Sequence, residues 1–367
     1  MHKLSTLTVN LYKSRVFQVK QYLSRINLDA FLVTDLANIL YLVGYTGSNG
    51  ILLIKKNNAR PIFYTDFRYK EQAYNEVYNC NIKITNRMLF SNFPVEDLTN
   101  VKTCGFDGNH LSYANYQRLK QQFKGKVKLI PIEDAFIEGL RSIKSKFELE
   151  KIKKAVATTD KVYAHIINMI RPNITEKDLA NEIDYQIKKQ ADLSFPTIVA
   201  FADRSALPHA QPTNRKLKKG DVVLFDFGAR FDYYCADMTR TVVFGKATSE
   251  IKKIYEIVLT AQKRAEENIK ANQYCADIDK SARDLIREKG YGDYFGHGLG
   301  HGVGILVHEK PVLSEKSTEQ LKVGQTVTVE PGIYLPNKFG IRIEDLVLVK
   351  SDYGEILTHS PKELIEL

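Results

Sequence analysis

The sequence predicts an α+β protein with a smaller α/β domain at residues 1–131 and a larger domain at residues 149–367, joined by a linker at residues 132–148. A length of 367 residues exceeds what one ordinary core serves. Before Pro131, short apolar runs alternate with amphipathic stretches, which favours an α/β unit. After Glu148, two long helices followed by strand-rich sequence occur twice, which indicates a duplicated helix–helix–strand architecture.

The first domain begins with a helix predicted at residues 11–26, where apolar side chains recur at helical spacing. Short strands are predicted next at residues 30–34, 38–45, 50–56 and 59–65. Asn57 and Asn58 suit the tip of a hairpin between the last two strands. Asp66 suits the cap of the helix that follows.

The second domain opens with a helix from about Leu149 that stops before Pro172. Thr175 then caps a second helix, with Asp178 at the third helical position. The second pass repeats this order, with helices predicted at residues 250–270 and 278–289 and strands up to about residue 349.

Two acidic residues lie within a predicted β-hairpin. Asp226 lies in one β-branched and aromatic run (residues 221–227) and Asp237 in the next (residues 233–243), symmetric about a turn centred near Phe231 and Asp232. A regular hairpin would make them a cross-strand pair, with Cβ atoms about 4.5–5.5 Å apart. Two carboxylates that close repel each other unless a proton or a cation lies between them.

The same arrangement returns near the end of the chain. Glu330 and Glu344 lie on two apolar runs and are symmetric about Asn337, within a Pro-Asn-Lys turn. One acid in a strand is usually an edge residue or an ion-pair partner. Two such pairs on apolar strands predict a site, because buried acids need partners.

Histidines precede the second pair. His297 and His301 have the spacing of an HExxH zinc helix, but Gly298 replaces the glutamate and the flanking glycines disfavour a helix. The glycines instead predict an extended strand whose backbone approaches something bound. His308 adds a third imidazole, and His209 is a weaker candidate when considered alone.

Composition excludes other classes. The chain is 44% apolar and 26% charged, and its net charge of +10 comes from scattered Lys and Arg rather than a basic block, so we expect no nucleic-acid partner. No apolar run suits a membrane span or a leader, and the four cysteines show no CxxC spacing. These features predict free thiols, no membrane partner and a cytoplasmic location.

Four carboxylates and a neutral imidazole would balance two divalent metal ions. Oxygen-rich donors without thiolate favour Mn²⁺, with Co²⁺, Zn²⁺ and Fe²⁺ as alternatives. Two such ions lower the pKa of a water molecule and polarise a carbonyl. The expected reaction class is metal-assisted hydrolysis of an acyl or phosphoryl bond.

These residues resemble the pita-bread metallopeptidases, which include methionine aminopeptidase, aminopeptidase P and prolidase, and their non-metal relative creatinase. The resemblance is carried, in the family's order, by SFPTIVA, SALPHA, LFDFGA, DMTRTVVFG, GHGLGHGVGILVHE, TVEPGIY and GIRIED. The segments YLVGYTGSNG and TDFRYKEQA are similar to the creatinase-like N-terminal domain of Xaa-Pro peptidases. The resemblance thus implies a catalytic pita-bread domain after a creatinase-like domain.

The resemblance also implies residue roles. Asp226 would be a terminal ligand of one metal ion, Asp237 and Glu344 would bridge both ions, and His301 and Glu330 would complete the second ion. The further catalytic residues that it implies are Glu330 as proton acceptor, His209, His297 and His308 on the substrate side, and Arg342 beside the site. Thr239 and Thr328 would supply hydroxyls that hydrogen-bond to the ligands.

The main functional hypothesis is an aminopeptidase P that removes an N-terminal residue ahead of proline, with a proline-containing peptide as substrate. The alternative is an Xaa-Pro dipeptidase (prolidase), and a more remote one is a non-catalytic binding module. The resemblance further implies a homodimer. Phe201-Ala202 stands where relatives commonly have Ser-Gly, which puts the position of the loop that leads to His209 in question.

Overall fold

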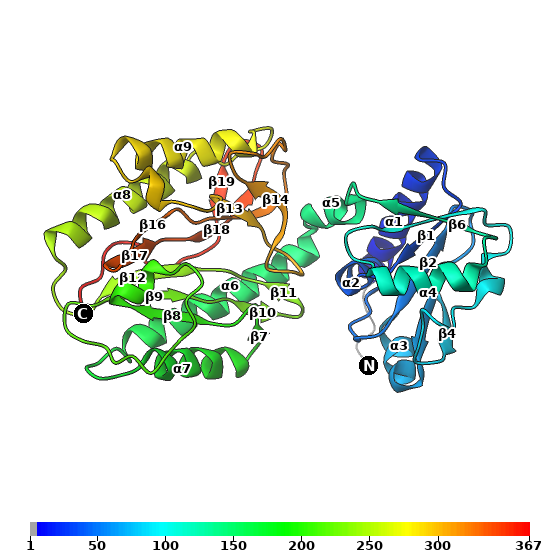
Figure 1. The fold of residues 1–367 in the computed structure, drawn as a ribbon, viewed down its shortest axis with the longest axis horizontal. Helices are drawn as coiled ribbons and strands as arrows, with labels where there is room; N and C mark the ends of the chain where they lie inside the picture. Colours follow the sequence, from blue (N-terminus) through cyan, green and yellow to red (C-terminus); the bar gives the residue numbers. More distant parts are fainter. Residues whose placement is uncertain (1–5) are drawn as a thin grey trace. The chain divides into compact units, whose positions relative to one another are not determined.

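The computed structural model describes residues 6–367 and divides the chain into two compact units, Met1–Arg141 and Ser142–Leu367 (Figure 1). Residues 1–5, which belong to the predicted first domain, lie outside the described part. The division falls within helix α5 (Phe136–Ser142), inside the stretch expected as the join. None of the helices that the structure describes is long and apolar enough to cross a membrane.

A mixed sheet forms the centre of the first unit. Over residues 6–141 its six strands run in the order β4-β3-β2-β1-β5-β6, with β1–β2 and β2–β3 antiparallel and the other neighbours parallel. The strands are β1 (Ala30–Val33), β2 (Ile51–Lys55), β3 (Ile62–Asp66), β4 (Asn81–Thr85), β5 (Thr103–Asp107) and β6 (Lys128–Ile132). The helices are α1 (Thr6–Arg25), α2 (Leu36–Val43), α3 (Lys70–Glu76), α4 (Tyr113–Phe123) and α5, with short 3₁₀ turns η1 (Phe67–Tyr69) and η2 (Val95–Leu98).

The strand predicted at residues 38–45 is wrong, because this segment forms helix α2. The Asp35 side chain caps its start by accepting hydrogen bonds from the backbone N–H groups of Ala37 and Asn38. Gly44 ends it in the left-handed conformation, at φ 85°. The run is apolar on nearly all sides and buried, so it lacks the periodicity that distinguishes a helix from a strand.

The second unit contains two helix pairs with strands between them. Figure 1 shows α6 and α7 on one side of these strands and α8 and α9 on the other. The helices are α6 (Lys146–Ile167), α7 (Glu176–Lys188), α8 (Ser249–Glu266) and α9 (Cys275–Glu288), with 3₁₀ turns η3 (Ala202–Ala206) and η4 (Gly292–Tyr294). Each pair packs on its own apolar core, so the helix–helix–strand order occurs twice and the α+β prediction is confirmed.

The strands of this unit form several small sheets. Those of the first half are β7 (Asp192–Leu193), β8 (Ile198–Phe201), β9 (Val222–Asp226), β10 (Ala229–Phe231), β11 (Tyr234–Cys235) and β12 (Thr239–Val243). Those of the second half are β13 (Gly300–Gly302), β14 (Glu309–Leu313), β15 (Thr326–Val329), β16 (Gly332–Leu335), β17 (Phe339–Arg342), β18 (Asp345–Val349) and β19 (Gly354–Ile356). The sheet orders, within residues 142–367, are β11-β10-β7, β12-β9-β8, β14-β13-β15-β18-β19 and β16-β17.

The register of the first hairpin differs from the prediction. Asp226 pairs with Thr239, so Asp237 is displaced by two residues and is not directly opposite Asp226. The turn lies at Asp232 and Tyr233, whose φ angles are 46° and 70°, one residue later than expected. Two successive positive φ angles make this a turn that suits the twist of a hairpin, although neither residue is glycine. A shift of two residues keeps side chains on the same face, so both acids still face one side.

The second hairpin has the register that the sequence predicts. Val329 pairs with Asp345 on one side of the acids, and Gly332 pairs with Arg342 on the other. Both pairings have the same register, which sets Glu330 opposite Glu344 where β15 gives way to β16.

Two glycines allow β13 to lie between its neighbours. A Cβ on Gly300 would be 2.0 Å from the carbonyl oxygen of Thr328, and one on Gly302 would be 2.1 Å from that of Lys310. The predicted close approach is therefore to the protein's own strands rather than to a bound molecule. It fixes the backbone on both sides of His301.

Replacing Gly300 with alanine should lower the free energy of unfolding by about 1–3 kcal/mol, because strand backbone must move to admit the methyl group. Gly296→Ala is the matched control, since a Cβ there meets nothing within 4 Å. Its effect should stay within about 0.5 kcal/mol. Urea denaturation of both variants measures this, and equal destabilisation would contradict the packing argument.

Candidate metal centre

A cavity of about 670 Å³ in the second unit collects every residue predicted for the site. The predicted residues that line it are His209, Asp226, Asp237, His297, His301, His308, Glu330, Arg342 and Glu344. They come from both helix–helix–strand halves, so the cavity lies where the two halves meet. The individual roles implied by the resemblance stay predictions.

Each acid stands where a strand ends or is interrupted. Asp226 is the last residue of β9, and Asp237 lies between β11 and β12. Glu330 directly follows β15, and Glu344 directly precedes β18. The strands fix the backbone on one side of each acid, while the break in pairing leaves room for the side chains to converge.

Burial, followed by repulsion between the carboxylates, raises the pKa values of three of the four acids. Burial, and then the charge of Glu344, raises the pKa of Asp237 well above its usual range. Burial, and then the charge of Glu330, does the same to the pKa of Glu344. Burial also raises the pKa of Asp226, although the guanidinium of Arg342 lies 2.5 Å away and opposes the shift. These carboxylates hold protons tightly unless another cation replaces them.

Glu330 differs from the other acids because it has a basic partner. Burial acts to raise its pKa, but the hydrogen bond and charge of His301, together with the charges of His297 and Arg342, lower it to about 2. The two side chains are 3.3 Å apart, from Nε2 of His301 to Oε1 of Glu330. Glu330 is therefore an ionised carboxylate at neutral pH.

The donor atoms fit metal ions. Asp226 Oδ1 and Glu344 Oε1 are buried, and neither accepts a hydrogen bond from any residue that the structure describes. Donor atoms of Asp237, His301 and Glu344 all lie within 4.8 Å of one another. Nδ1 of His301 lies 3.1 Å from the carbonyl oxygen of Gly302, which accepts only from an N–H and so leaves Nε2 as the ligating nitrogen. Unpaired buried oxygens are expected where a cation belongs.

The hydroxyls expected near the ligands are in contact with them. Thr239 Oγ1 donates to Glu344 Oε2 at 2.7 Å, and Thr328 Oγ1 lies 3.2 Å from Glu330 Oε1. The hydroxyl of Thr328 also accepts a hydrogen bond from the backbone N–H of His301. The contact of Thr239 with Glu344 joins the first half of the unit to the second, while Thr328 contacts two residues of its own half.

Tyr334, which the sequence did not single out, links Arg342 to His297. Arg342 Nη1 donates to the tyrosine oxygen at 2.9 Å, and that oxygen lies 2.8 Å from Nε2 of His297. The other ring nitrogen of His297 faces the carbonyl oxygen of Gly298. Burial lowers the pKa of His297, so the ring is neutral, donates from Nδ1 and accepts the tyrosine proton at Nε2.

His209 and His308 differ from His297 in this respect. Neither ring forms a hydrogen bond with a side chain or backbone group in residues 6–367. Burial, and then the neighbouring His301, lowers the pKa of His308. Both rings therefore present nitrogens that a substrate could use.

Phe201 and Ala202, the departure noted in the sequence, do not line the cavity. Phe201 is fully buried in the core beneath α6 and α7. Ala202 has φ 45°, a left-handed conformation that disfavours any residue with a Cβ. Alanine at position 202 therefore strains the backbone at the start of the loop that carries His209.

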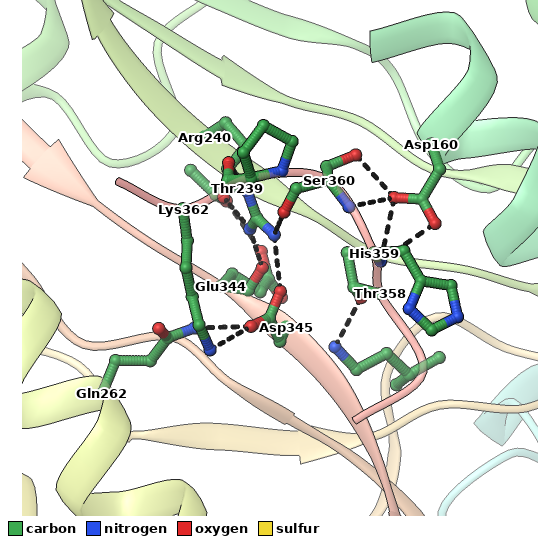
Figure 2. A network of polar contacts seen from close by, with 12 residues as sticks. Asp160, Thr239, Arg240, Gln262, Glu344, Asp345, Thr358, His359, Ser360 and Lys362 are labelled. Atoms are coloured by element: carbon green, nitrogen blue, oxygen red, sulfur yellow. Dashed lines mark hydrogen bonds and ion pairs between the residues drawn. The ribbon is translucent and has the colours of Figure 1, made fainter. Parts of the chain in front are cut away.

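Behind the ligands, Arg240 joins the site to the last part of the chain (Figure 2). Its Nη1 donates to the carbonyl oxygens of Thr239 and Glu344, and Nη2 donates to Asp345 Oδ1 and to the carbonyl oxygen of Ser360. Nε donates to the carbonyl oxygen of Pro361, so all five N–H groups are used. The sequence analysis did not single out Arg240, although an arginine next to the apolar residues of TRTVV could have drawn attention to it.

The network continues beyond Arg240. Lys362 Nζ lies 2.7 Å from both Glu266 and Asp345. Asp160 accepts hydrogen bonds from the backbone N–H groups of His359 and Ser360. Figure 2 shows Ser360 of the C-terminal segment between Arg240 and Asp160, with Lys362 beside Asp345.

A second group of metal-type side chains, Asp35, His110 and Glu138, lies in the first unit. Its charges already have protein partners. Arg141 donates to Asp35 at 3.4 Å, and the Asn38 amide donates to Glu138 at 2.7 Å. We assign this group to holding α2 and α5 in place.

Asp237→Asn should weaken Mn²⁺ binding strongly. Loss of a residue that only hydrogen-bonds to a metal ligand typically weakens metal binding by about 10–100-fold, and loss of a ligand itself should weaken it by more. The substitution should not destabilise the metal-free protein, because it removes one of the repelling charges. Titration calorimetry and urea denaturation measure the two effects. Asp232→Asn is the control, since that acid lies in the same hairpin and is half exposed beside Lys151. Equal metal affinity of both variants would contradict the assignment.

Ala202→Gly should raise the free energy of unfolding by about 0.5–1 kcal/mol, because glycine adopts φ 45° without the Cβ penalty. Ala206→Gly, in the same 3₁₀ turn but without a positive φ, should instead lower it. Thermal unfolding of both variants measures the difference. A fall in stability for Ala202→Gly would show that the loop is not strained there.

Comparison with known proteins agrees with this geometry. The model described as metallopeptidase family M24 matches residues 150–351, and the creatinase/prolidase N-terminal domain matches residues 15–143. An Xaa-Pro dipeptidase of Pyrococcus furiosus is 35% identical over 355 residues, which is 96% of this chain and 100% of that protein.

Solved structures give the same result. An Xaa-Pro dipeptidase from Bacillus anthracis has a TM-score of 0.92 and 38% identity, covering 97% of this chain and 100% of that one. An X-Pro aminopeptidase from Thermotoga maritima has a TM-score of 0.84 and 38% identity, covering 94% of this chain and 99% of that one. With the fold, the donor set and full-length relatives in agreement, this chain belongs to metallopeptidase family M24, the pita-bread metallopeptidases.

Proposed function

We propose that this protein is a dinuclear metal-dependent peptidase that cleaves Xaa-Pro dipeptides. The observation that carries the proposal is the pair of buried oxygens without hydrogen-bond partners, on Asp226 and Glu344, within a group of acids beside an open cavity. Mn²⁺ is the expected ion, because the donors are mostly carboxylate oxygens. Two divalent ions bound there would lower the pKa of a water molecule and polarise the scissile carbonyl.

The protein's own groups would carry the protons. Glu330, which lines the cavity 3.3 Å from His301, would accept a proton from the attacking water. His209 and His308 have free ring nitrogens that can contact the substrate carbonyl and the leaving nitrogen. His297 is occupied on both nitrogens, so we assign it to orienting Tyr334 and Arg342 rather than to the substrate.

Proline suits the cavity and explains a dedicated enzyme. A prolyl nitrogen has no hydrogen, and its ring fixes φ, so an enzyme that recognises a peptide N–H at that position would fail. The apolar lining residues that can receive the ring are Phe195, Pro196, Ile198, Val307 and Val312. A cavity of about 670 Å³ has the size usual for small-molecule sites.

The comparisons favour the dipeptidase over aminopeptidase P, which is the main hypothesis from the sequence. Two of the relatives described above are named Xaa-Pro dipeptidases, and each spans its full length against this chain. One observation favours the aminopeptidase hypothesis: the X-Pro aminopeptidase from Thermotoga maritima has the same 38% sequence identity to this chain as the Bacillus anthracis dipeptidase.

Hydrolysis of matched substrates separates the two activities. Mn²⁺-loaded protein should cleave Ala-Pro at least about tenfold faster, as kcat/KM, than Ala-Pro-amide or Ala-Pro-Ala, because a dipeptidase recognises the free carboxylate. Ala-Ala controls for proline specificity. Faster cleavage of Ala-Pro-Ala would establish an aminopeptidase, and no hydrolysis with Mn²⁺, Co²⁺ or Zn²⁺ would overturn the enzymatic proposal.

A further inference from the structure

We propose that Glu176 is a positioning residue for His209, which it holds at the cavity by fastening the two ends of the loop at residues 201–213. The proposal rests on the proposed function in one respect: it takes His209 to contact the substrate. Glu176 itself does not line the cavity.

Glu176 is the first residue of α7, and its side chain is fully buried. Oε1 accepts hydrogen bonds from the backbone N–H of Phe201 at 2.9 Å and from Arg204 Nε at 3.1 Å. Oε2 accepts from the backbone N–H of Thr213 at 2.8 Å and from its hydroxyl at 2.6 Å. One carboxylate therefore contacts the first residue of the loop, the last residue, and an arginine between them.

Arg204 extends this contact toward His209. While Nε binds Glu176, Nη2 donates to the carbonyl oxygen of Gln211, two residues beyond the histidine. Gln211 lines the cavity together with His209. The buried charge on α7 is thus connected to the cavity wall through one guanidinium.

The far side of the loop is tied to the metal-bearing hairpin. Ser205 Oγ accepts a hydrogen bond from the backbone N–H of Gly340, and Arg342 Nη1 donates to the carbonyl oxygen of Pro208 at 3.3 Å. These contacts set the middle of the loop, and Glu176 sets its ends. His209 lies outside any helix or strand, so its position depends on both.

The chemistry of the contact requires a carboxylate. The groups that surround Glu176 are all donors, namely two backbone N–H groups, a hydroxyl and a guanidinium, and hydrogen bonds to an ionised acceptor are about twice as strong as neutral ones. Glutamine has the same shape, but its NH₂ would face an N–H donor at one end of the loop. The backbone N–H at that end of the loop would lose its acceptor, while helix α7 would be unchanged.

An alternative explanation is that Glu176 only stabilises the fold. An acid in the first turn of a helix is favoured by the helix dipole wherever it points. The two explanations differ in what happens when His209 is absent, because a residue that acts through His209 has nothing left to position.

The test is a double-mutant cycle on the full chain, loaded with Mn²⁺ and assayed with Ala-Pro. Glu176→Gln should lower kcat/KM by about tenfold to a hundredfold, since small displacements of a catalytic group have effects of that size. In a His209→Ala background the same change should have less than about a twofold effect. Metal content should be the same in all four proteins.

Asp178→Asn is the matched control. Asp178 lies in the same first turn and accepts a hydrogen bond from the backbone N–H of Thr175, but it does not touch the loop. This variant should retain wild-type kcat/KM. A loss equal to that of Glu176→Gln, or an equal effect of Glu176→Gln with and without His209, would overturn the proposal in favour of a purely structural role.

A readout without catalysis separates this proposal from the proposed function. The ring ¹H–¹³C resonance of His209, assigned by its absence in His209→Ala, should shift or broaden in Glu176→Gln and stay unchanged in Asp178→Asn. An unchanged resonance would refute the proposal even if the protein cleaved no peptide.

A second variant covers the case in which Glu176→Gln does not fold. Thr213→Val removes one donor to the carboxylate and leaves the charge in place, and Thr213→Ser restores the hydroxyl. The valine variant should shift the His209 resonance, and the serine variant should return it. A His209 resonance with the same chemical shift and width in both variants as in the wild type would also overturn the proposal.

Discussion

Mutual repulsion among buried carboxylates is the constraint on which the second unit depends. Asp226, Asp237 and Glu344 all have raised pKa values, and burial is the largest cause for each. Such a group is unfavourable by itself, because the charges repel and water cannot screen them. Cations bound there would complete the group, and the surrounding contacts keep together oxygens that would otherwise separate.

Two arginines, Arg342 and Arg240, help to hold the carboxylates together, each in a different way. Arg342 binds side chains: it contacts Asp226, Thr239 and Tyr334, and it balances charge directly in the cavity. Arg240 binds mainly backbone, including the carbonyl oxygen of Glu344. It therefore fixes the position of the Glu344 backbone rather than the direction of its carboxylate. Replacing either arginine by lysine would lose the planar set of donors that reaches several partners at once.

The sequence predicts most of the fold and the members of the site, because both depend on local signals. Turn residues and apolar runs place Glu330 opposite Glu344 in the observed register. The first hairpin is displaced because Asp232 and Tyr233 take positive φ angles, which residues other than glycine seldom do.

Other features have no local signal. The segment predicted as a strand contains most of helix α2 (Leu36–Val43), since Asp35 and Gly44 cap an apolar, largely buried run that has no clear period. Tyr334 and Glu176 owe their importance to partners far away in the sequence. An isolated tyrosine in a strand and an acid in a first turn are ordinary residues until the fold brings those partners to them.

The contacts of Arg240 also set an order of events during synthesis. The arginine and the Ser360 carbonyl that it binds are separated by 120 residues, so a ribosome releases one long before the other. Until that later segment emerges, the guanidinium can bind Thr239, Glu344 and Asp345, but it lacks the carbonyl oxygens of Ser360 and Pro361. The donor set of Arg240 is therefore completed last, by acceptors in the C-terminal segment.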